Sequence, residues 1–592
     1  MRWKSLLLAL VIGGLLFMLP AASMAEDNSH AVAFAELVAD FEAHELRHDP
    51  IRAGERGDLE ALGRWPDRSP SVLSAKLADE AAFLARLESI SVDALYENDA
   101  VSHVVLDYWL RSRLALGAFA PQRVGFTNDS GFFSQPFGLA SRTRPANLAE
   151  AEAWLQRLQS LPDFLAQHRD WLQRGVDEGF VQPGLIAGRV VEQLEAVVAM
   201  SLEDHPLMAP LSALPARTDE VAREQLAEAM QVAISEQVVP AYQALLDFFT
   251  EVYLAEPRES VGISEVPQGR EFYRQLVRHH TTLDTTPEAV HAQGLSEVAR
   301  IRTEMEDVIA ETGFVGSFDA FLHYLRTDPK FYAQSERELL MHAAYISKRA
   351  DDAMPRFFRH LPRLPYGVRP VPASLAPNYT TGRYWAGNLD AGVAGGYLVN
   401  TYRLDQRPLY ELPALTVHEA VPGHHHQVAV AQELEGVPDF RRNNYITAFG
   451  EGWALYTEHL AIEMDIYETP YEHFGRLTYE MWRACRLVVD TGLHYFGWTQ
   501  AQAEACLLEN SALSEHNVRT EIERYISWPG QALAYKPGEL LIRQLRAEAE
   551  DMLGEAFDVR DFHDHLLAMG AMPLSALEAR MRAWTRARGA AQ

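Results

Sequence analysis

The amino-acid sequence predicts a mainly α-helical protein, because apolar residues recur three and four positions apart over most of the chain. NLAEAEAWLQRLQSLPDFLAQHRDWLQRGV is one such segment, with charged residues between the apolar ones. Helix-start signals agree: Thr286 precedes Pro287, and Ser317 precedes Phe318. No linker rich in Gly, Ser or Pro divides the chain, so we expect one large helical body over residues 26–592, with an N-terminal lobe of about 26–290 and a C-terminal lobe of about 291–592.

The first 25 residues, MRWKSLLLALVIGGLLFMLPAASMA, have the pattern of a secretory signal peptide. Arg2 and Lys4 precede an apolar run, and small residues follow it, which predicts cleavage near Ala25. The alternative is a membrane anchor, but the run is shorter than the roughly 20 residues that a span requires, and no cysteine follows that could carry a lipid. We therefore expect an exported protein, periplasmic or secreted, with no stable membrane insertion after cleavage.

Charge and cysteine content exclude several classes of function. The formal net charge is -29, so nucleic acid is not an expected partner. The chain has 2 cysteines, Cys485 and Cys506, too few for a disulfide scaffold or a site of several thiolates. The sequence leaves open whether these two form a disulfide, and it leaves the oligomeric state open.

One region interrupts the helical pattern, from about residue 363 to residue 413. Here β-branched and aromatic residues from Gly396 to Leu404 predict a strand, with Gly395 and Gly396 as its turn. We expect a small hairpin or sheet directly before the segment that carries most of the chemistry.

That segment is HEAVPGHHHQ, residues 418–427. It is mostly flanked by apolar residues, and buried imidazoles need partners, which a metal ion can supply. In the H-E-x-x-H motif two histidines four apart bind zinc and the adjacent Glu is the general base. Position 422 is Pro, so the next candidate after His418 is His424, and a bulge at Pro422-Gly423 would bring it into place. His425 remains the alternative ligand.

A third zinc ligand is expected from GEGWALYTEHL, where Glu451 opens another apolar helix. Glu458 lies seven residues further along the same face and is expected to support a ligand or the fold.

Taken together, HEAVPGHHHQ, GEGWALYTEHL and RYISWPGQALAYKPGEL resemble the bacterial family called domain of unknown function 885, over most of the exported chain. That family is similar in motif order to helical zinc peptidases of the thimet oligopeptidase and angiotensin-converting enzyme type. The resemblance implies a two-lobed, zincin-like helical fold with a small sheet beside a deep cleft, and a metallopeptidase that acts on short peptides. Two additional residues between the histidines depart from the peptidase motif.

The expected chemistry is hydrolysis by a zinc-bound water, with Glu419 as general base. The resemblance implies a late Tyr or His that stabilises the oxyanion, and Tyr535 and then His494 are the candidates. Substrate contacts are expected from the predicted strand, through Gly396, Tyr397 and Asn400, and from Arg524 and Tyr525. Hydrolysis of a non-peptide amide or ester, or peptide binding without turnover, are the alternatives. The sequence does not reveal the substrate sequence, the preference for chain ends or the native metal.

Overall fold

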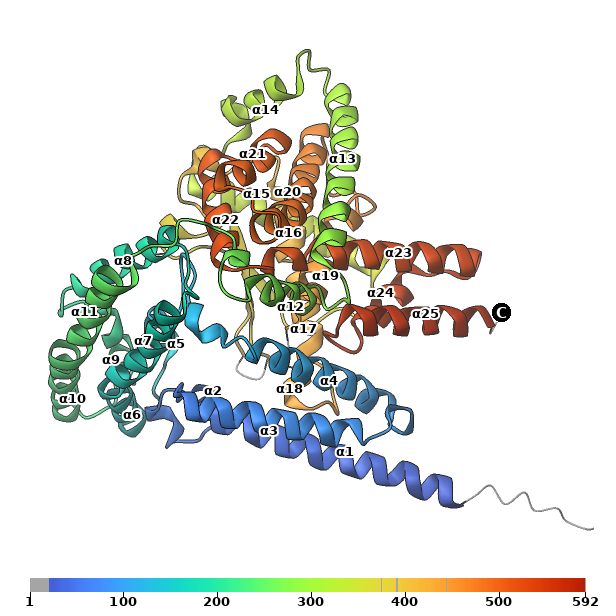
Figure 1. Cartoon of the computed structure of the whole chain (residues 1–592). Helices are drawn as coiled ribbons and strands as arrows, with labels where there is room; N and C mark the ends of the chain where they lie inside the picture. Colours follow the sequence, from blue (N-terminus) through green and yellow to red (C-terminus); the bar gives the residue numbers. More distant parts are fainter. Residues whose placement is uncertain (1–20, 374, 390–391, 443–444, 591–592) are drawn as a thin grey trace, which may run out of the picture.

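A computed structural model describes the chain except residues 1–20, 374, 390–391, 443–444 and 591–592. The protein is mainly α-helical with one small sheet, as the periodicity predicts (Figure 1). Most of the predicted signal peptide lies outside the described residues. The first helix, α1, begins at Ala21.

The N-terminal helices form two groups in Figure 1. The first group is drawn in blue and comprises α1 (Ala21–His48), α2 (Pro50–Glu55), α3 (Pro70–Glu88) and α4 (Glu97–Gly117). The second group, in cyan to green, comprises α5 (Gln135–Arg142), α6 (Leu148–Gln159), α7 (Leu161–Glu178), α8 (Gly184–Val198), α9 (Ala209–Ser212), α10 (Glu220–Ala233) and α11 (Val239–Phe248).

The remaining helices are drawn in green to red (Figure 1). They are α12 (Gly269–Thr281), α13 (Pro287–Glu311), α14 (Phe318–Thr327), α15 (Glu336–Phe357), α16 (Leu412–Glu419), α17 (His424–Gln432), α18 (Asp439–Arg442), α19 (Thr447–Leu460), α20 (Pro470–His494), α21 (Gln500–Asn510), α22 (Glu515–Ser527), α23 (Lys536–Leu553), α24 (Val559–Leu567) and α25 (Leu574–Ala590).

Two predicted helix starts are confirmed by their capping bonds. The side chain of Thr286 accepts a hydrogen bond from the backbone N–H of Ala289 at the start of α13. The Ser317 side chain does the same for Ala320 at the start of α14. Each bond satisfies a backbone donor that the first helical turn leaves free.

The predicted sheet is present, but its arrangement differs from the expectation. It comprises β1 (Tyr366–Pro370), β2 (Gly382–Trp385) and β3 (Gly395–Val399), in the order β1-β3-β2. β3 is parallel to β1 and antiparallel to β2. The predicted strand is therefore shorter than Gly396 to Leu404, and Gly395 and Gly396 belong to it rather than to a turn. Because β3 is the central strand, it has no free edge.

The largest cluster of buried apolar side chains runs from Phe34 to Met581 and so joins the N-terminal helices to the C-terminal ones. Within the described part of the chain, no helix is both long enough and apolar enough to cross a bilayer. Cys485 and Cys506 are free thiols, and the Cys485 Sγ atom lies 3.7 Å from the carbonyl oxygen of Cys506.

Candidate metal centre

The HEAVPGHHHQ segment folds as two helices rather than as one helix with a bulge. α16 ends at Glu419 and α17 begins at His424, and residues 420–423 connect them. The Val421–Pro422 peptide bond in this connection is cis. The Trp453 indole N–H on α19 donates a hydrogen bond to the Pro422 carbonyl at 2.8 Å, which ties the connection to the next helix.

Gly423 is required because the chain folds back on the end of α16. A Cβ atom at this position would lie 2.0 Å from the carbonyl oxygen of His418 and 2.4 Å from that of Val417. The Gly423 N–H donates to the same Val417 carbonyl at 3.0 Å. Only glycine tolerates such a close approach of two backbone segments.

The connection brings His418 and His424 together, and α19 adds Glu451. One ligand atom from each of the three side chains lies within 4.8 Å of the other two. The His418 Nε2 atom is 3.5 Å from Glu451 Oε2, and the His424 Nε2 atom is 3.4 Å from the same oxygen. The two imidazole rings are nearly perpendicular, at 89°.

These separations suit a shared metal ion. They are longer than a usual hydrogen bond, which spans roughly 2.7–3.2 Å between donor and acceptor. Two atoms bound to one tetrahedral zinc, with bonds of about 2.1 Å, lie about 3.4 Å apart. Two imidazoles and a carboxylate are also the donor set of many catalytic zinc sites. The three residues therefore fit a zinc ion by chemistry and by spacing.

Glu458 lies on α19, seven residues after Glu451, and contacts the His418 nitrogen that faces away from Glu451. Its Oε1 atom is 2.7 Å from His418 Nδ1 and 3.6 Å from an Arg483 nitrogen. Burial lowers the pKa of His418, but the carboxylates of Glu451 and Glu458 beside the imidazole favour its charged form, outweigh burial and raise that pKa to about 10. A carboxylate on the nitrogen that faces away from the metal is the usual outer partner of a zinc-bound histidine, and it fixes the tautomer.

Glu419 is held by the sheet. Its Oε2 atom accepts a hydrogen bond of 2.7 Å from the backbone N–H of Tyr384 on β2. Its Oε1 atom has no hydrogen bond among the described residues. The strand thus orients one oxygen of the carboxylate beside His418 and leaves the other for chemistry.

Tyr445 is a site residue that the sequence reasoning missed. Its hydroxyl donates to Glu451 Oε1 at 3.3 Å, and its ring centroid lies 6.3 Å from that of His424. Gly450 makes room for it, since a Cβ atom there would lie 2.5 Å from the Tyr445 ring. Only its position six residues before Glu451, on the segment leading into α19, could have indicated it.

His425 does not join the cluster. Its Nδ1 atom lies 3.1 Å from the Tyr384 hydroxyl, and its ring centroid lies 4.6 Å from that of Tyr366, with the two rings tilted by 46°. Burial lowers its pKa to about 4. His426 is buried against Phe358, with ring centroids 4.5 Å apart. Of the three consecutive histidines, the geometry favours His424 as the ligand.

Two predicted site residues are core residues instead. His494 is fully buried: its Nδ1 accepts from the Ile263 N–H at 3.1 Å, and its Nε2 lies 2.9 Å from the Tyr525 carbonyl oxygen. Both nitrogens have backbone partners in this structure, so neither is free to face the oxyanion that the sequence prediction assigned to it. The buried Tyr525 hydroxyl accepts hydrogen bonds from Trp482 and Arg486, so it does not face a substrate either.

The strand that was expected to contact substrate offers no free edge for it, because β3 is the central strand. Gly396 pairs with β1 and β2. The Tyr397 hydroxyl is buried 3.2 Å from the Thr416 hydroxyl. The Asn400 amide donates to three carbonyls, and its oxygen accepts from the Tyr402 N–H. The strand with an unpaired edge next to Glu419 is β2.

Tyr535 and Arg524 lie together. An Arg524 guanidinium nitrogen is 3.5 Å from the Tyr535 hydroxyl, and Arg524 also donates to Gln531 at 2.6 Å. The Arg486 guanidinium covers the Tyr535 ring at 4.2 Å. Tyr535 is 7% exposed, whereas Tyr445 is 46% exposed.

A cavity of about 250 Å³ lies beside Tyr445, and residues of α4 and α12 line it. Aromatic and neutral polar groups dominate its walls. The Ser112 hydroxyl is 2.6 Å from His279 Nδ1, and Arg113 is neutralised by Glu45 at 2.9 Å. Its lining residues are Tyr108, Trp109, Ser112, Arg113, His279, His280, Tyr445, Ile446 and Thr447. Tyr445 is therefore common to the cavity and the cluster.

Fold and site together define a large, mainly α-helical protein with a mostly buried His-His-Glu cluster that fits a divalent metal ion. The chain belongs to the bacterial protein family of unknown function DUF885, whose model matches residues 50–581. This finding confirms the family resemblance seen in the sequence.

The solved structures that are similar to the chain include two that are described as "putative lipoprotein". One, described as a "putative lipoprotein" from Colwellia psychrerythraea, has 26% sequence identity and a TM-score of 0.87, and the match covers 95% of this chain and 99% of that one. The other, a "putative lipoprotein of unknown function" from Shewanella oneidensis, has 18% identity and a TM-score of 0.72, and the match covers 93% and 99% of the two chains. No curated protein matches the chain.

Proposed function

We propose that the protein is an exported, zinc-dependent hydrolase that cleaves amide bonds in short peptides. The observation that carries this proposal is the separation of 3.5 and 3.4 Å between Glu451 Oε2 and the Nε2 atoms of His418 and His424, with a carboxylate, Glu419, directly next to one of the histidines. His418, His424 and Glu451 hold the ion, and Glu458 holds His418.

When bound, a zinc ion supplies Lewis acidity, which polarises a carbonyl and makes a water molecule more acidic. Glu419 Oε1 is the atom that accepts a proton from the attacking water and delivers it to the amine nitrogen that leaves. The Tyr384 N–H keeps the other oxygen in place, so the free oxygen does not have to be reoriented during the reaction.

Tyr445 is the preferred hydrogen-bond donor to the carbonyl oxygen of the substrate. Its hydroxyl is next to a proposed ligand, and the residue is far more exposed than Tyr535. A donor aimed at the developing oxyanion is worth about 10² to 10³ in rate. Tyr535, with Arg524 beside it, is the second candidate.

The cavity next to Tyr445 is the proposed binding site for part of the substrate. In this proposal it lies between the two lobes of a zincin-like fold, and it takes a side chain of the peptide. Its neutral, aromatic lining favours an uncharged, bulky side chain. Export is supported by the leader-like residues 1–25 and by the description of the two structures from Colwellia psychrerythraea and Shewanella oneidensis as "putative lipoprotein".

The decisive experiment compares metal content and turnover in matched variants. The protein should contain zinc by elemental analysis and should hydrolyse a mixture of short peptides, whereas His418→Ala and Glu451→Gln should each lose turnover and the zinc equivalent bound at this cluster. Glu419→Gln should keep its zinc and lose turnover, because Glu419 is not a ligand in this proposal.

Glu435→Gln, a change of an exposed carboxylate after α17, is the control and should keep both zinc and turnover. Esters and non-peptide amides are assayed in parallel. Turnover retained in Glu419→Gln would reject the mechanism. A zinc-loaded protein with no turnover of any of these substrates would instead favour a binding role.

A further inference from the structure

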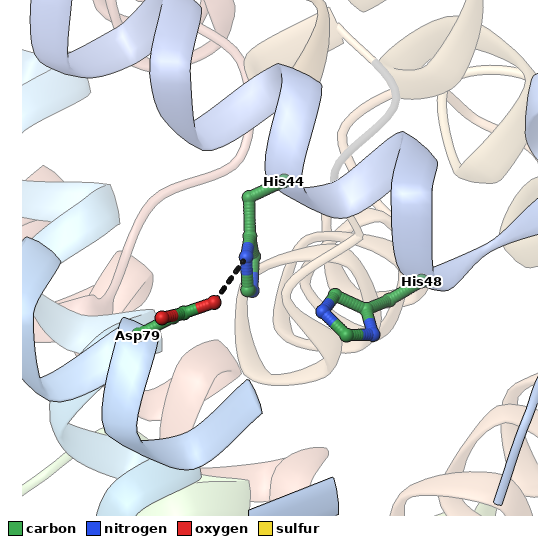
Figure 2. Close-up of side chains that lie close together, drawn as sticks. All are labelled: His44, His48 and Asp79. Carbon is green, nitrogen blue, oxygen red and sulfur yellow. Dashed lines mark ion pairs between the residues drawn. The ribbon is translucent and has the colours of Figure 1, made fainter. Parts of the chain in front are cut away.

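A second group of metal-ligating side chains lies on the N-terminal helices, in a part of the fold that the hydrolase proposal does not use. His44 and His48 project from successive turns near the end of α1, and Asp79 projects from the neighbouring α3 (Figure 2). Two residues four apart on a helix lie on one face, so both imidazoles can reach one ion. One ligand atom from each of the three residues lies within 4.8 Å of the other two.

His44 is the unusual member of this group. Its side chain is 0% exposed, yet neither ring nitrogen has a hydrogen-bond partner within the described part of the chain. Its ring packs 5.3 Å from Phe83, edge to face, and 4.6 Å from His48. A buried imidazole without partners costs free energy unless a ligand satisfies it.

Asp79 lies where its carboxylate could bind the same ion as His44 and His48. Its Oδ2 atom lies 3.5 Å from His44 Nδ1, the contact that is dashed in Figure 2. This separation is again longer than a usual hydrogen bond and close to the ligand spacing of about 3.4 Å on a tetrahedral ion. Asp79 makes no hydrogen bond to the described residues, and its side chain is 56% exposed, so it is free to rotate.

The other carboxylates near His44 already pair with basic side chains. Glu45 and Glu80 also have oxygens close to a His44 nitrogen. However, both accept hydrogen bonds from Arg113, at 2.9 and 3.2 Å, and both lie near Lys76. Asp79 is therefore the carboxylate that fits the role of ligand.

We propose that His44, His48 and Asp79 bind a second divalent transition-metal ion, such as zinc, that fastens the end of α1 to α3. The exposed Asp79 leaves the ion open to water, which completes its coordination. This open site should release zinc to a chelator more readily than the mostly buried cluster of His418, His424 and Glu451. The inference does not depend on hydrolase activity.

Zinc binding to the chelator-treated, purified protein is measured by calorimetry and by elemental analysis after dialysis. The native protein should bind two equivalents of zinc. Each of the single variants His48→Ala and Asp79→Asn should bind one equivalent fewer. Neither side chain is fully buried, so both variants should fold. The double variant His418→Ala/Glu451→Gln should lose the other equivalent and keep this one.

Asp40→Asn is the matched control. It removes a carboxylate of α1, the helix that also carries His44 and His48, and this carboxylate pairs with Arg86 of α3. It should leave both equivalents in place. The proposal is overturned if the protein binds no zinc beyond the equivalent lost in His418→Ala/Glu451→Gln, or if His48→Ala and Asp79→Asn both retain two equivalents.

Discussion

The Nδ1 atom of His418 lies 2.7 Å from Glu458 Oε1, so a carboxylate fixes the imidazole from the side that faces away from Glu451. Replacing Glu458 by Gln removes the charge that holds this tautomer and makes the ring a weaker donor to a metal. We expect Glu458→Gln to bind zinc about 10- to 100-fold more weakly, measured by competition with a chelator. Glu463→Gln, a change of an exposed carboxylate paired with Arg546 beyond α19, should bind zinc normally.

Gly423 provides a test of the helix break. In Gly423→Ala the new methyl group would lie 2.0 Å from the His418 carbonyl oxygen, so residues 420–423 must move and take His424 with them. We expect a loss of unfolding free energy of about 2 kcal/mol or more, and a loss of zinc. Gly188→Ala on α8, where no atom lies within 4 Å of the new Cβ, should keep its zinc and be equally or more stable. Normal zinc content in Gly423→Ala would show that the connection does not place His424.

The two tyrosines near the cluster can be separated kinetically. Tyr445→Phe should lower kcat about 10²- to 10³-fold, because its hydroxyl is the proposed donor to the substrate's carbonyl oxygen. Tyr535→Phe should have a much smaller effect, since its hydroxyl is mostly buried beside Arg524. The opposite order of effects would assign the donor role to Tyr535. Zinc content should be unchanged in both variants.

Trp109, on α4, forms a wall of the cavity beside Tyr445 and is not one of the three residues that fit a metal ion. Trp109→Ala should raise KM for peptides with a bulky, uncharged side chain several-fold, with a smaller change in kcat, because it removes binding area away from the reacting atoms. Peptides with small side chains should be affected less. An equal effect on every peptide would contradict the proposed place of the side chain.

The sequence was sufficient to predict the mainly α fold, the small sheet and the meeting of His418, His424 and Glu451, because each depends on local pattern or on residue chemistry. It did not reveal how the helix is interrupted. Whether Pro422-Gly423 makes a bulge or a full break depends on where the carbonyls of residues 417 and 418 lie, and that is a property of the folded backbone.

The errors have a common cause, since they concern neighbours that are distant in the sequence. The β-branched residues of β3 indicate a strand, but its central position depends on pairing with β1 and β2, which are short and have a weak strand pattern. His494 has the residue type of a catalytic group, but the backbone of Ile263 and Tyr525 occupies both of its nitrogens. Tyr445 has no local signal beyond its position six residues before Glu451, and packing against Gly450 brings it to Glu451.

Asp490 should make stability depend on pH. Burial raises the pKa of its carboxyl from 3.8 to about 7, although hydrogen bonds from the Tyr273 hydroxyl, at 2.5 Å, and from the Gly530 N–H oppose this shift. The folded protein therefore binds a proton that the unfolded chain has released between about pH 4 and pH 7, and this contribution to stability is lost as the pH rises through about 7. The slope is at most about 1.4 kcal/mol per pH unit for one group.

Asp490→Asn cannot titrate at this position, so its unfolding free energy in urea should fall less than that of the native protein between pH 5 and 8. Tyr273→Phe removes a hydrogen bond that favours the charged carboxylate and so raises the folded-state pKa of Asp490 further, and the loss of stability should therefore continue to a higher pH than in the native protein. Identical pH profiles for the native protein and Asp490→Asn would mean that Asp490 keeps its charge when it is buried. In that case the two hydrogen bonds, rather than protonation, compensate for its burial between α12, α20 and the turn at Gly530.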